Sequence, residues 1–301
     1  KFDYYISYYD FIKKKNSQSL DSTLNFWKKI LKSDCCTEFP VLINDSNDIY
    51  SSDEDRIKYS FSGKKLEEIK NFVKLKNVTL FNLFLSILYI LIYKYTNEKF
   101  ICLDTIMGTS NKFNQDNLIG LLNNTLLLPF NLDTNLKLDE YLDKCKKKNL
   151  SILENGEILL EKMVNNLEIK SLPNVRIHFE FSSKNSENNV KIGETIIESD
   201  FFENTSNSIR QLLMFNFGLT KNSLDCFISY KKKCFKKQHI NELKSNLEKI
   251  LDIFLDNKNI TINEILEKLE INNNFNSKYK SKIDKRLLAY SMAGSYPNVN
   301  Y

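Results

Sequence analysis

The sequence predicts a mixed α/β domain in which helices cover one face of a largely mixed sheet. Two hydrophobic patterns support this fold class. Along the first half of the chain, segments with apolar residues at three- and four-residue spacing, typical of helices on a core, alternate with strand-like runs. The second half is richer in runs of alternating apolar and polar residues, typical of strands with one buried face. Elements in this order favour one sheet with a helical layer.

The first half of the chain contains one very apolar helix that is expected to be fully buried. It spans 80–95, and Thr79 precedes it in the capping position. The other elements predicted here, in chain order, are a helix at 20–31, a strand at 56–62 closed by Gly63, an amphipathic helix at 66–73, a strand at 99–107 ending at Gly108, a buried strand at 126–130, and helices near 138–150 and 158–167.

The clearest strand of the second half lies at 175–182. Its apolar residues fall on one side, and Arg176, His178 and Glu180 fall on the other. Further strands are predicted at 194–199, 210–217 and 224–230, followed by an amphipathic helix at 240–254 and a short helix at 262–269. We expect residues 1–270 to form the folded domain and residues 271–301, which begin with a polar stretch, to form a linker or tail.

Composition excludes several functional classes. Hydrophobic residues make up 42% and charged residues 27% of the 301 residues, as in ordinary soluble globular proteins. The net charge of +5 is spread over scattered lysine clusters, which favours solvated surfaces over a nucleic-acid interface. The most apolar window, 81–93, is shorter than the roughly 20 residues that span a bilayer, so no membrane contact is expected.

The cysteines and histidines indicate neither disulfides nor a metal site. The six cysteines include no C-x-x-C motif, and His178 and His239 are the only imidazole ligands. We therefore expect no metal and a reducing, cytoplasmic compartment.

No self-contained catalytic motif is present: the sequence has no P-loop, G-x-G-x-x-G, G-x-S-x-G or H-E-x-x-H. His178 is a candidate general base that Glu180 or Arg176 would tune. A histidine on a solvent-facing strand surface is the favoured alternative for His178, and a surface role is expected for His239.

The stretch 119–129, IGLLNNTLLLP, places polar residues inside an apolar run. Gly120 permits a turn or a close backbone approach that a side chain would block. Asn124 and Thr125 lie at the start of a buried strand, where an unpaired polar group costs about 1–3 kcal/mol. Either they bond locally to backbone, or they line a wet cavity. Asp104 likewise interrupts an apolar strand and faces a cavity or marks the end of the sheet.

Residues 119–125 resemble the I-G-x-F-V-N-T motif of condensation domains from nonribosomal peptide synthetases. Other motifs of that family match in the same order between Tyr4 and Leu269. They are Tyr8, Asp10 and Phe11 for Y-x-D-F; Phe26, Trp27 and Leu31 with Phe39 and Pro40 for the family's tyrosine-tryptophan helix and leucine-proline; and Asn155, Glu157 and Glu161 for N-Q-D-x-P-F-E.

The resemblance implies a chloramphenicol-acetyltransferase-like fold, in which two lobes face each other across a tunnel. Carrier domains bring thioesters on phosphopantetheine arms into the tunnel from opposite sides, and the acceptor amine attacks the donor thioester. The family's catalytic H-H-x-x-x-D-G motif lies on the first lobe and has no match in this chain. The chain therefore resembles the second, acceptor-side lobe with its lead-in segment, with no catalytic residue of its own.

The same resemblance implies site residues and partners. Asn124 and Thr125, with His178 as a weaker candidate, are expected to line the tunnel, and Gly120 is expected to shape the turn before them. No cofactor is expected to bind directly, since the phosphopantetheine arms of carrier domains are substrates. Expected partners are carrier domains and the missing N-terminal lobe, with an adjacent adenylation domain as a further candidate.

The chain departs from the family pattern at three places. Pro129 replaces the arginine that closes the I-G-x-F-V-N-T block, Thr109 replaces the arginine after Gly108, and Leu159-Leu160 replaces proline-phenylalanine. The lost arginines motivate a second hypothesis, a non-catalytic condensation-like module that recruits carriers or other enzymes. A third hypothesis is a related acyltransferase that uses coenzyme A; it too needs the missing histidine.

Overall fold

The structure, a computed structural model, describes residues 21–42, 53–108, 123–181, 189–192, 195–198, 211–256, 258–272, 275 and 277–279. In chain order its elements are α2 (Asp21–Ile30), β1 (Phe39–Val41), β2 (Glu54–Ser62), α3 (Gly63–Leu75), α4 (Leu80–Thr96), β3 (Phe100–Gly108), β4 (Asn123–Asn131), α5 (Leu138–Glu154), α6 (Leu160–Asn166), β5 (Val175–Phe181), β6 (Asn189–Ile192), β7 (Thr195–Glu198), β8 (Leu213–Leu219), β9 (Ser223–Lys231), α7 (Lys237–Leu255), α8 (Ile262–Glu267) and β10 (Ser277–Tyr279).

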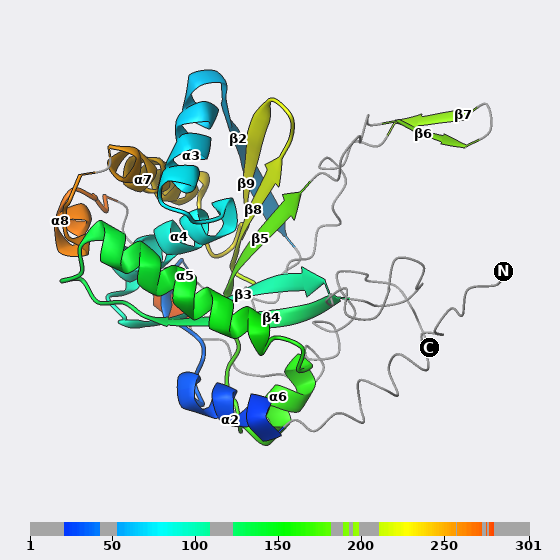
Figure 1. The fold of residues 1–301 in the computed structure, drawn as a ribbon, viewed down its shortest axis with the longest axis vertical. Coiled ribbons are helices and arrows are strands. Elements are labelled where there is room, and N and C mark those ends of the chain that lie inside the picture. Colours follow the sequence, from blue (N-terminus) through cyan, green and yellow to red (C-terminus); the bar gives the residue numbers. More distant parts are fainter. Residues whose placement is uncertain are drawn as a thin grey trace.

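The main sheet has six strands in the order β2-β9-β8-β5-β3-β4. β5 runs parallel to both of its neighbours, β3 and β8, whereas the other pairs are antiparallel. Helices α3, α4, α5 and α7 lie on one side of this sheet (Figure 1). The structure thus has the mixed sheet with a one-sided helical layer that the sequence predicts. The order of helices and strands agrees apart from the three short strands β1, β6 and β10, which the sequence did not predict.

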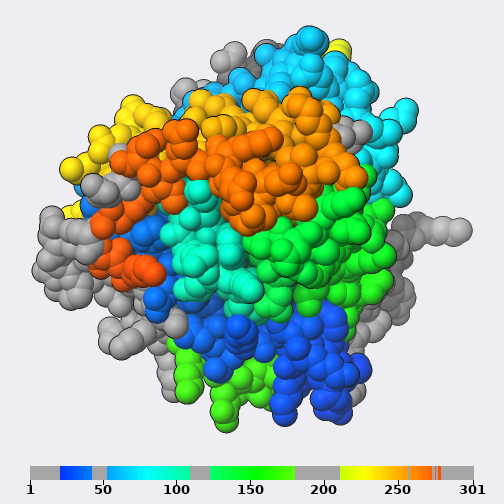
Figure 2. Space-filling view, turned by 90° about the vertical axis from the view of Figure 1, so that its left-hand side faces the viewer, coloured from blue at the N-terminus to red at the C-terminus, as the bar shows by residue number. Residues whose placement is uncertain are grey.

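Helix α4 is the centre of the helical layer. Its residues are apolar on all sides of the helix, as expected for a helix surrounded by other elements. It contacts helices α3, α5, α7 and α8 and strands β1 and β3. The Thr79 side chain accepts a hydrogen bond from the Asn82 backbone N–H, as expected for its capping position, and Asn97 ends the helix in the left-handed conformation with φ 57°. Figure 2 shows this side of the molecule, where α5 (green), α7 and α8 (orange) and α2 (blue) form the surface.

The C-terminal part of the described chain folds back on the domain. β10, inside the segment predicted to be a linker or tail, pairs antiparallel with β1. The ring of Phe275 packs against His239 with 4.8 Å between ring centroids. The expected surface role of His239 is wrong: the side chain is buried, and its Nδ1 accepts the Lys236 backbone N–H at the start of α7. His239 stands four residues before Leu243, on the buried stripe of that helix.

Within the described residues no single helix is long and apolar enough to cross a membrane. Helices α3 and α4 reach that length and composition only together, with a bend of 96° between them.

Candidate functional site

The main sheet has two chemically different faces. The Phe84 ring of α4 lies 4.3 Å from the Phe217 ring of β8 and 6.5 Å from the Phe179 ring of β5, measured between centroids. These aromatic residues therefore lie on the face that the helices cover, which we call the helix face. Since side chains alternate along a strand, Arg176 and His178 of β5 point to the opposite side, which we call the second face.

Asn124 and Thr125, adjacent in β4, point to opposite faces of the sheet. Phe130 lies on the helix face, because its ring stacks on Tyr89 of α4 at 4.7 Å between centroids. Asn124 lies an even number of residues away and so shares the helix face, whereas Thr125 belongs to the second face. The two residues cannot line the same cavity side by side.

The Asn124 side chain braces the connection between α5 and α6. Its Nδ2 donates to the Gly156 carbonyl at 3.1 Å and to the Ile158 carbonyl at 2.7 Å. Asn124 is only 7% exposed, so both amide protons are used inside the domain. Of the two alternatives left open by the sequence, local bonding to backbone is the one that the geometry supports for this residue.

A buried charged cluster lies on the second face. Asp104 of β3 stands opposite Arg176 of β5. Arg176 donates from Nε to Asp104 Oδ1 at 2.8 Å and from Nη2 to Asp104 Oδ2 at 3.0 Å, and Gln211 Nε2 donates to Oδ2 at 2.9 Å. Asp104 is completely buried and Arg176 is 9% exposed, so the two-pronged pair is held in a water-poor setting where hydrogen bonds to charge are strong.

This cluster occupies the junction where the sheet divides. Asp104 opposite Arg176 is the one residue pair in register between β3 and β5, whereas β3 pairs with β4 at nine positions and β5 with β8 at seven. In Figure 1 the carboxyl end of β3, together with the amino end of β4 that pairs with it, diverges from β5. Asp104, Arg176 and Gln211, which we call the clamp, therefore join the strands where the backbone hydrogen-bond ladder is shortest.

His178 follows the clamp along β5. It stands opposite Asn216 of β8, and a hydrogen bond joins the two side chains. Burial lowers the pKa of His178, the nearby Arg176 guanidinium lowers it further, and the hydrogen bond to Asn216 raises it. The imidazole is therefore neutral near pH 7, and a neutral imidazole has one N–H donor and one lone-pair acceptor.

Other predicted residues have structural surroundings or lie outside the described residues. Gly120, Thr109, Tyr8, Asp10 and Phe11 are outside them. The Asn155 carbonyl at the end of α5 accepts the Trp27 indole N–H at 2.9 Å, which joins two motifs of the resemblance. Pro129 is buried in β4, an edge strand of the sheet, where the missing N–H of proline is tolerated.

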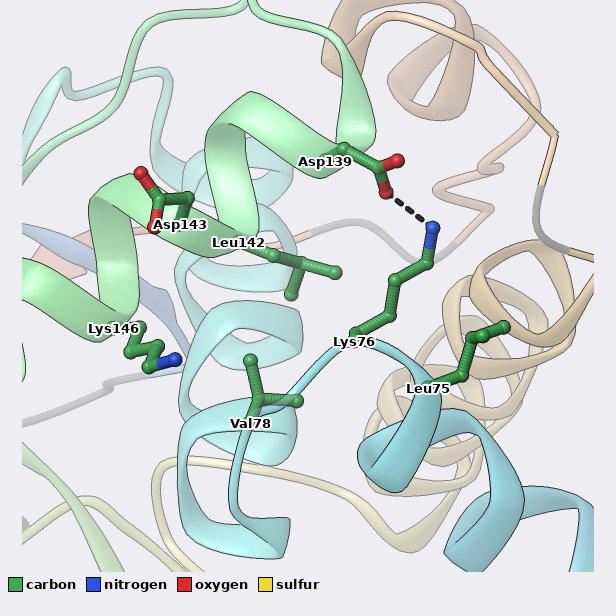
Figure 3. Close-up of a pocket in the computed structure, with 7 residues that line it drawn as sticks. All are labelled: Leu75, Lys76, Val78, Asp139, Leu142, Asp143 and Lys146. Carbon is green, nitrogen blue, oxygen red and sulfur yellow. Dashed lines mark hydrogen bonds and ion pairs between the residues drawn. The ribbon is translucent and has the colours of Figure 1, made fainter.

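A surface pocket of about 350 Å³ lies on the helical layer, away from these residues (Figure 3). Its lining combines a few apolar side chains with two lysines and two aspartates, and Lys76 pairs with Asp139 at 2.5 Å. It contains no histidine or cysteine, so it lacks a nucleophile or a base that titrates near neutral pH. In the part of the chain that the structure describes, no group of three histidine, cysteine or carboxylate side chains could hold a metal.

Sequence reasoning missed the clamp as a unit. The sequence shows Asp104 and Arg176 as separate polar residues in two strands, but their pairing depends on β3 and β5 being neighbours, which no local pattern reveals. Gln211 and Asn216 gave no signal of their own.

Comparisons with known proteins agree on one family. The sequence model of the Condensation domain matches residues 3–270. Gramicidin S synthase 2 of Aneurinibacillus migulanus is 24% identical over 272 residues, which are 87% of this chain and 6% of the synthase. The chain thus spans a small fraction of the curated relatives that it matches.

Solved structures show the same fold at low sequence identity. The condensation domain from the Monacolin K polyketide synthase MokA superposes with a TM-score of 0.70 at 11% identity, covering 87% of this chain and 64% of that chain. The complex of the X-domain and OxyB from teicoplanin biosynthesis gives a TM-score of 0.70 at 13% identity, covering 86% of this chain and 57% of that chain.

Proposed function

The chain belongs to the condensation domain family, and from that premise we propose that it forms the second, acceptor-side lobe of an amide-forming condensation unit in a nonribosomal peptide synthetase. The observation that carries the proposal is the match of the family across residues 3–270, which include both faces of the sheet. The chloramphenicol-acetyltransferase-like architecture expected from the sequence agrees with the superposed condensation domain.

In this proposal the catalytic histidine comes from outside these 301 residues. The H-H-x-x-x-D-G motif does not occur in the sequence, whose two histidines, His178 and His239, are far apart. His239 is buried at the start of α7 and cannot reach a substrate. The chain also covers only 64% of the superposed MokA condensation domain, which supports a partner lobe supplied by another segment or chain.

The second face of the sheet is the proposed tunnel wall. Thr125 and His178 lie on this face, near the place where the carboxyl ends of β3 and β5 diverge. Ligands of sheets with parallel strands commonly bind beyond the carboxyl ends of diverging strands. Asn124 is assigned to bracing instead, because its amide is bonded on the helix face. Gly120 keeps its proposed role in the preceding turn.

The proposed substrates are acyl and aminoacyl thioesters on the phosphopantetheine arms of carrier domains, with an adenylation domain as a further neighbour. The acceptor amine nitrogen forms a bond to the donor thioester carbon, and the carbon–sulfur bond breaks. The base of the other lobe takes the amine proton and passes it to the leaving sulfur, so that the donor arm leaves as a thiol. This chain would orient the reacting groups, which is the contribution of proximity to catalysis.

A second candidate function is recruitment without catalysis. Pro129 favours it, because it replaces the family's arginine and removes a positive charge from the second face. One superposed structure is a complex of an X-domain with OxyB, so this fold can present a surface to another protein. Carrier or enzyme docking would then be the whole role of the chain.

The test loads donor and acceptor carrier domains and mixes them with the full-length protein that contains this chain. We expect a dipeptidyl acceptor carrier, detected by intact-protein mass spectrometry. Carriers that bind while no dipeptide forms would overturn the catalytic proposal in favour of recruitment. Acyl transfer from free coenzyme A to the acceptor would instead identify a coenzyme A-dependent acyltransferase.

A further inference from the structure

We infer that Asp104, Arg176 and Gln211 are positioning residues for His178, and that they hold its imidazole against Asn216 as the group on the second face that accepts an N–H from a bound substrate. The inference rests on the proposed function, in which this face borders the tunnel. It assigns roles to five residues on β3, on β5, within β8 and just before β8.

The first step is the connection from the clamp to the imidazole. Arg176 and His178 are two residues apart on β5 and so project from the same face. Arg176 is held in place, because two of its nitrogens bind the buried Asp104 carboxylate, whose Oδ2 also accepts a hydrogen bond from Gln211. The positive charge that faces His178 therefore stays at a fixed place on the strand.

The second step concerns the strand on the other side of His178. Gln211 lies two residues before β8 begins, and Asn216 lies within β8, opposite His178. The clamp thus fixes the start of β8 as well as β5, and with it the register that sets Asn216 against the imidazole. The charged groups that the clamp brings to this region are Arg176 on the same strand and Asp104 on β3, whereas Asn216 on β8 is uncharged.

The third step is the chemistry of the ligand. We infer that the Asn216 oxygen accepts the one N–H of the neutral imidazole, which leaves the other ring nitrogen to accept a hydrogen bond from the ligand. It fits an N–H donor, which a carrier-borne substrate offers either as the acceptor amine or as an amide of the pantetheine arm. Arg176 opposes protonation of the ring and so preserves the acceptor.

The experiment follows the two histidine signals by nuclear magnetic resonance. The chain has only His178 and His239, so selective labelling of histidine rings gives two resonances, and His178→Gln assigns them. His239 serves as an internal reference, because it lies on α7, where it bonds to the Lys236 backbone and packs against Phe275. The double variant Asp104→Asn with Arg176→Gln removes both charges together, so that no unpaired charge is left buried. Arg56→Gln, on the edge strand β2, is the matched control.

In the wild-type chain we expect His178 to titrate below the ordinary histidine range. The double variant should raise the pKa of His178 and leave that of His239 unchanged, and Arg56→Gln should change neither. A clamp that only joins β3 to β5, with its charges too far from the imidazole to act on it, would not move this pKa. A folded double variant in which His178 titrates as in the wild type would overturn the inference.

Ligand addition tests the acceptor role. Pantetheine offers amide N–H groups, and an amide-linked aminoacyl pantetheine adds a free amine. We expect at least one of them to shift the His178 resonance, with binding about tenfold weaker in the double variant, the effect of losing one well-placed hydrogen bond. A shift with both ligands identifies the amide, and a shift with the aminoacyl form alone identifies the amine. No shift of His178 with either ligand at saturation would overturn the acceptor role.

Failure here is distinguishable from failure of the proposed function. If the dipeptide forms but the pKa of His178 does not respond to the double variant, this inference alone is overturned. A His178 that responds to Arg176 and to pantetheine, in a full-length protein that forms no dipeptide, would sink the catalytic proposal alone.

Discussion

The two faces of the sheet use opposite chemistry to hold the same strands. On the helix face, β5 and β8 present Phe179, Phe215 and Phe217 to α4, and stability comes from apolar area removed from water. On the second face, the same two strands carry Arg176, His178 and Asn216, which interact through charge and hydrogen bonds. Apolar packing tolerates small shifts, whereas bidentate bonds fix a register. The helix face therefore supplies most of the stability, and the second face fixes the positions of the strands relative to one another.

The largest expected effect is on the helix face. Phe84 is completely buried and contacts rings from three strands, so Phe84→Ala should lower the free energy of unfolding by about 4 kcal/mol through lost burial and a cavity. Urea denaturation measures the loss. Leu75→Ala is the matched control, because Leu75 is 68% exposed and should change the free energy by less than about 0.5 kcal/mol. Equal effects of the two variants would contradict the role given to the helix face.

The next largest effect is on the second face, where the free energy of unfolding depends on the pairing of two charges and not on the volume of a side chain. Arg176→Gln alone should cost about 3 kcal/mol, since it leaves the carboxylate of Asp104 buried without its cation. Adding Asp104→Asn should recover most of that loss although it removes a second charge. A double variant less stable than the single one would show that the clamp contributes bulk stability, and the comparison of the faces would then fail.

The adjacent pair Asn124 and Thr125 tests the comparison within one strand. Asn124→Ala should lower the free energy of unfolding by about 2 kcal/mol, because it leaves the buried carbonyls of Gly156 and Ile158 without their donor. The same variant should leave the pantetheine-induced shift of His178 unchanged. Loss of that shift in a folded Asn124→Ala protein would place Asn124 at the site.

Thr125→Val should show the reverse pattern. The substitution keeps the shape of the side chain and should cost about 1 kcal/mol or less in unfolding free energy, the usual value of one hydroxyl hydrogen bond. In the full-length protein it should slow dipeptide formation, measured under single-turnover conditions with loaded carriers. Unchanged turnover would remove Thr125 from the proposed tunnel wall.

Local patterns predicted the elements well, because their causes are local. The apolar run of α4, its Thr79 cap and the alternation of β5 each depend on residues that are consecutive in the sequence. The site was only partly predictable. The motif treats Asn124 and Thr125 as a unit, although a strand must send them to opposite faces. The partner of Asp104 is 72 residues away, and only the placement of β3 beside β5 reveals it.

The smallest expected effect is on the pH dependence of stability, and it compares His178 on the second face with His239 on helix α7. Burial is the main cause that lowers the pKa of both, so each takes up a proton more readily in the unfolded chain. The free energy of unfolding should therefore be level above the ordinary histidine range and fall as the pH drops through about 6.5. His178→Gln should remove more of this slope than His239→Gln, because Arg176 adds to the lowering at His178 whereas Glu242 opposes it at His239. Urea denaturation at three pH values between 7.5 and 5.5 isolates the difference, since carboxylates contribute alike in all variants. A larger loss of slope in His239→Gln would mean that the cap of α7, and not the second face, senses pH.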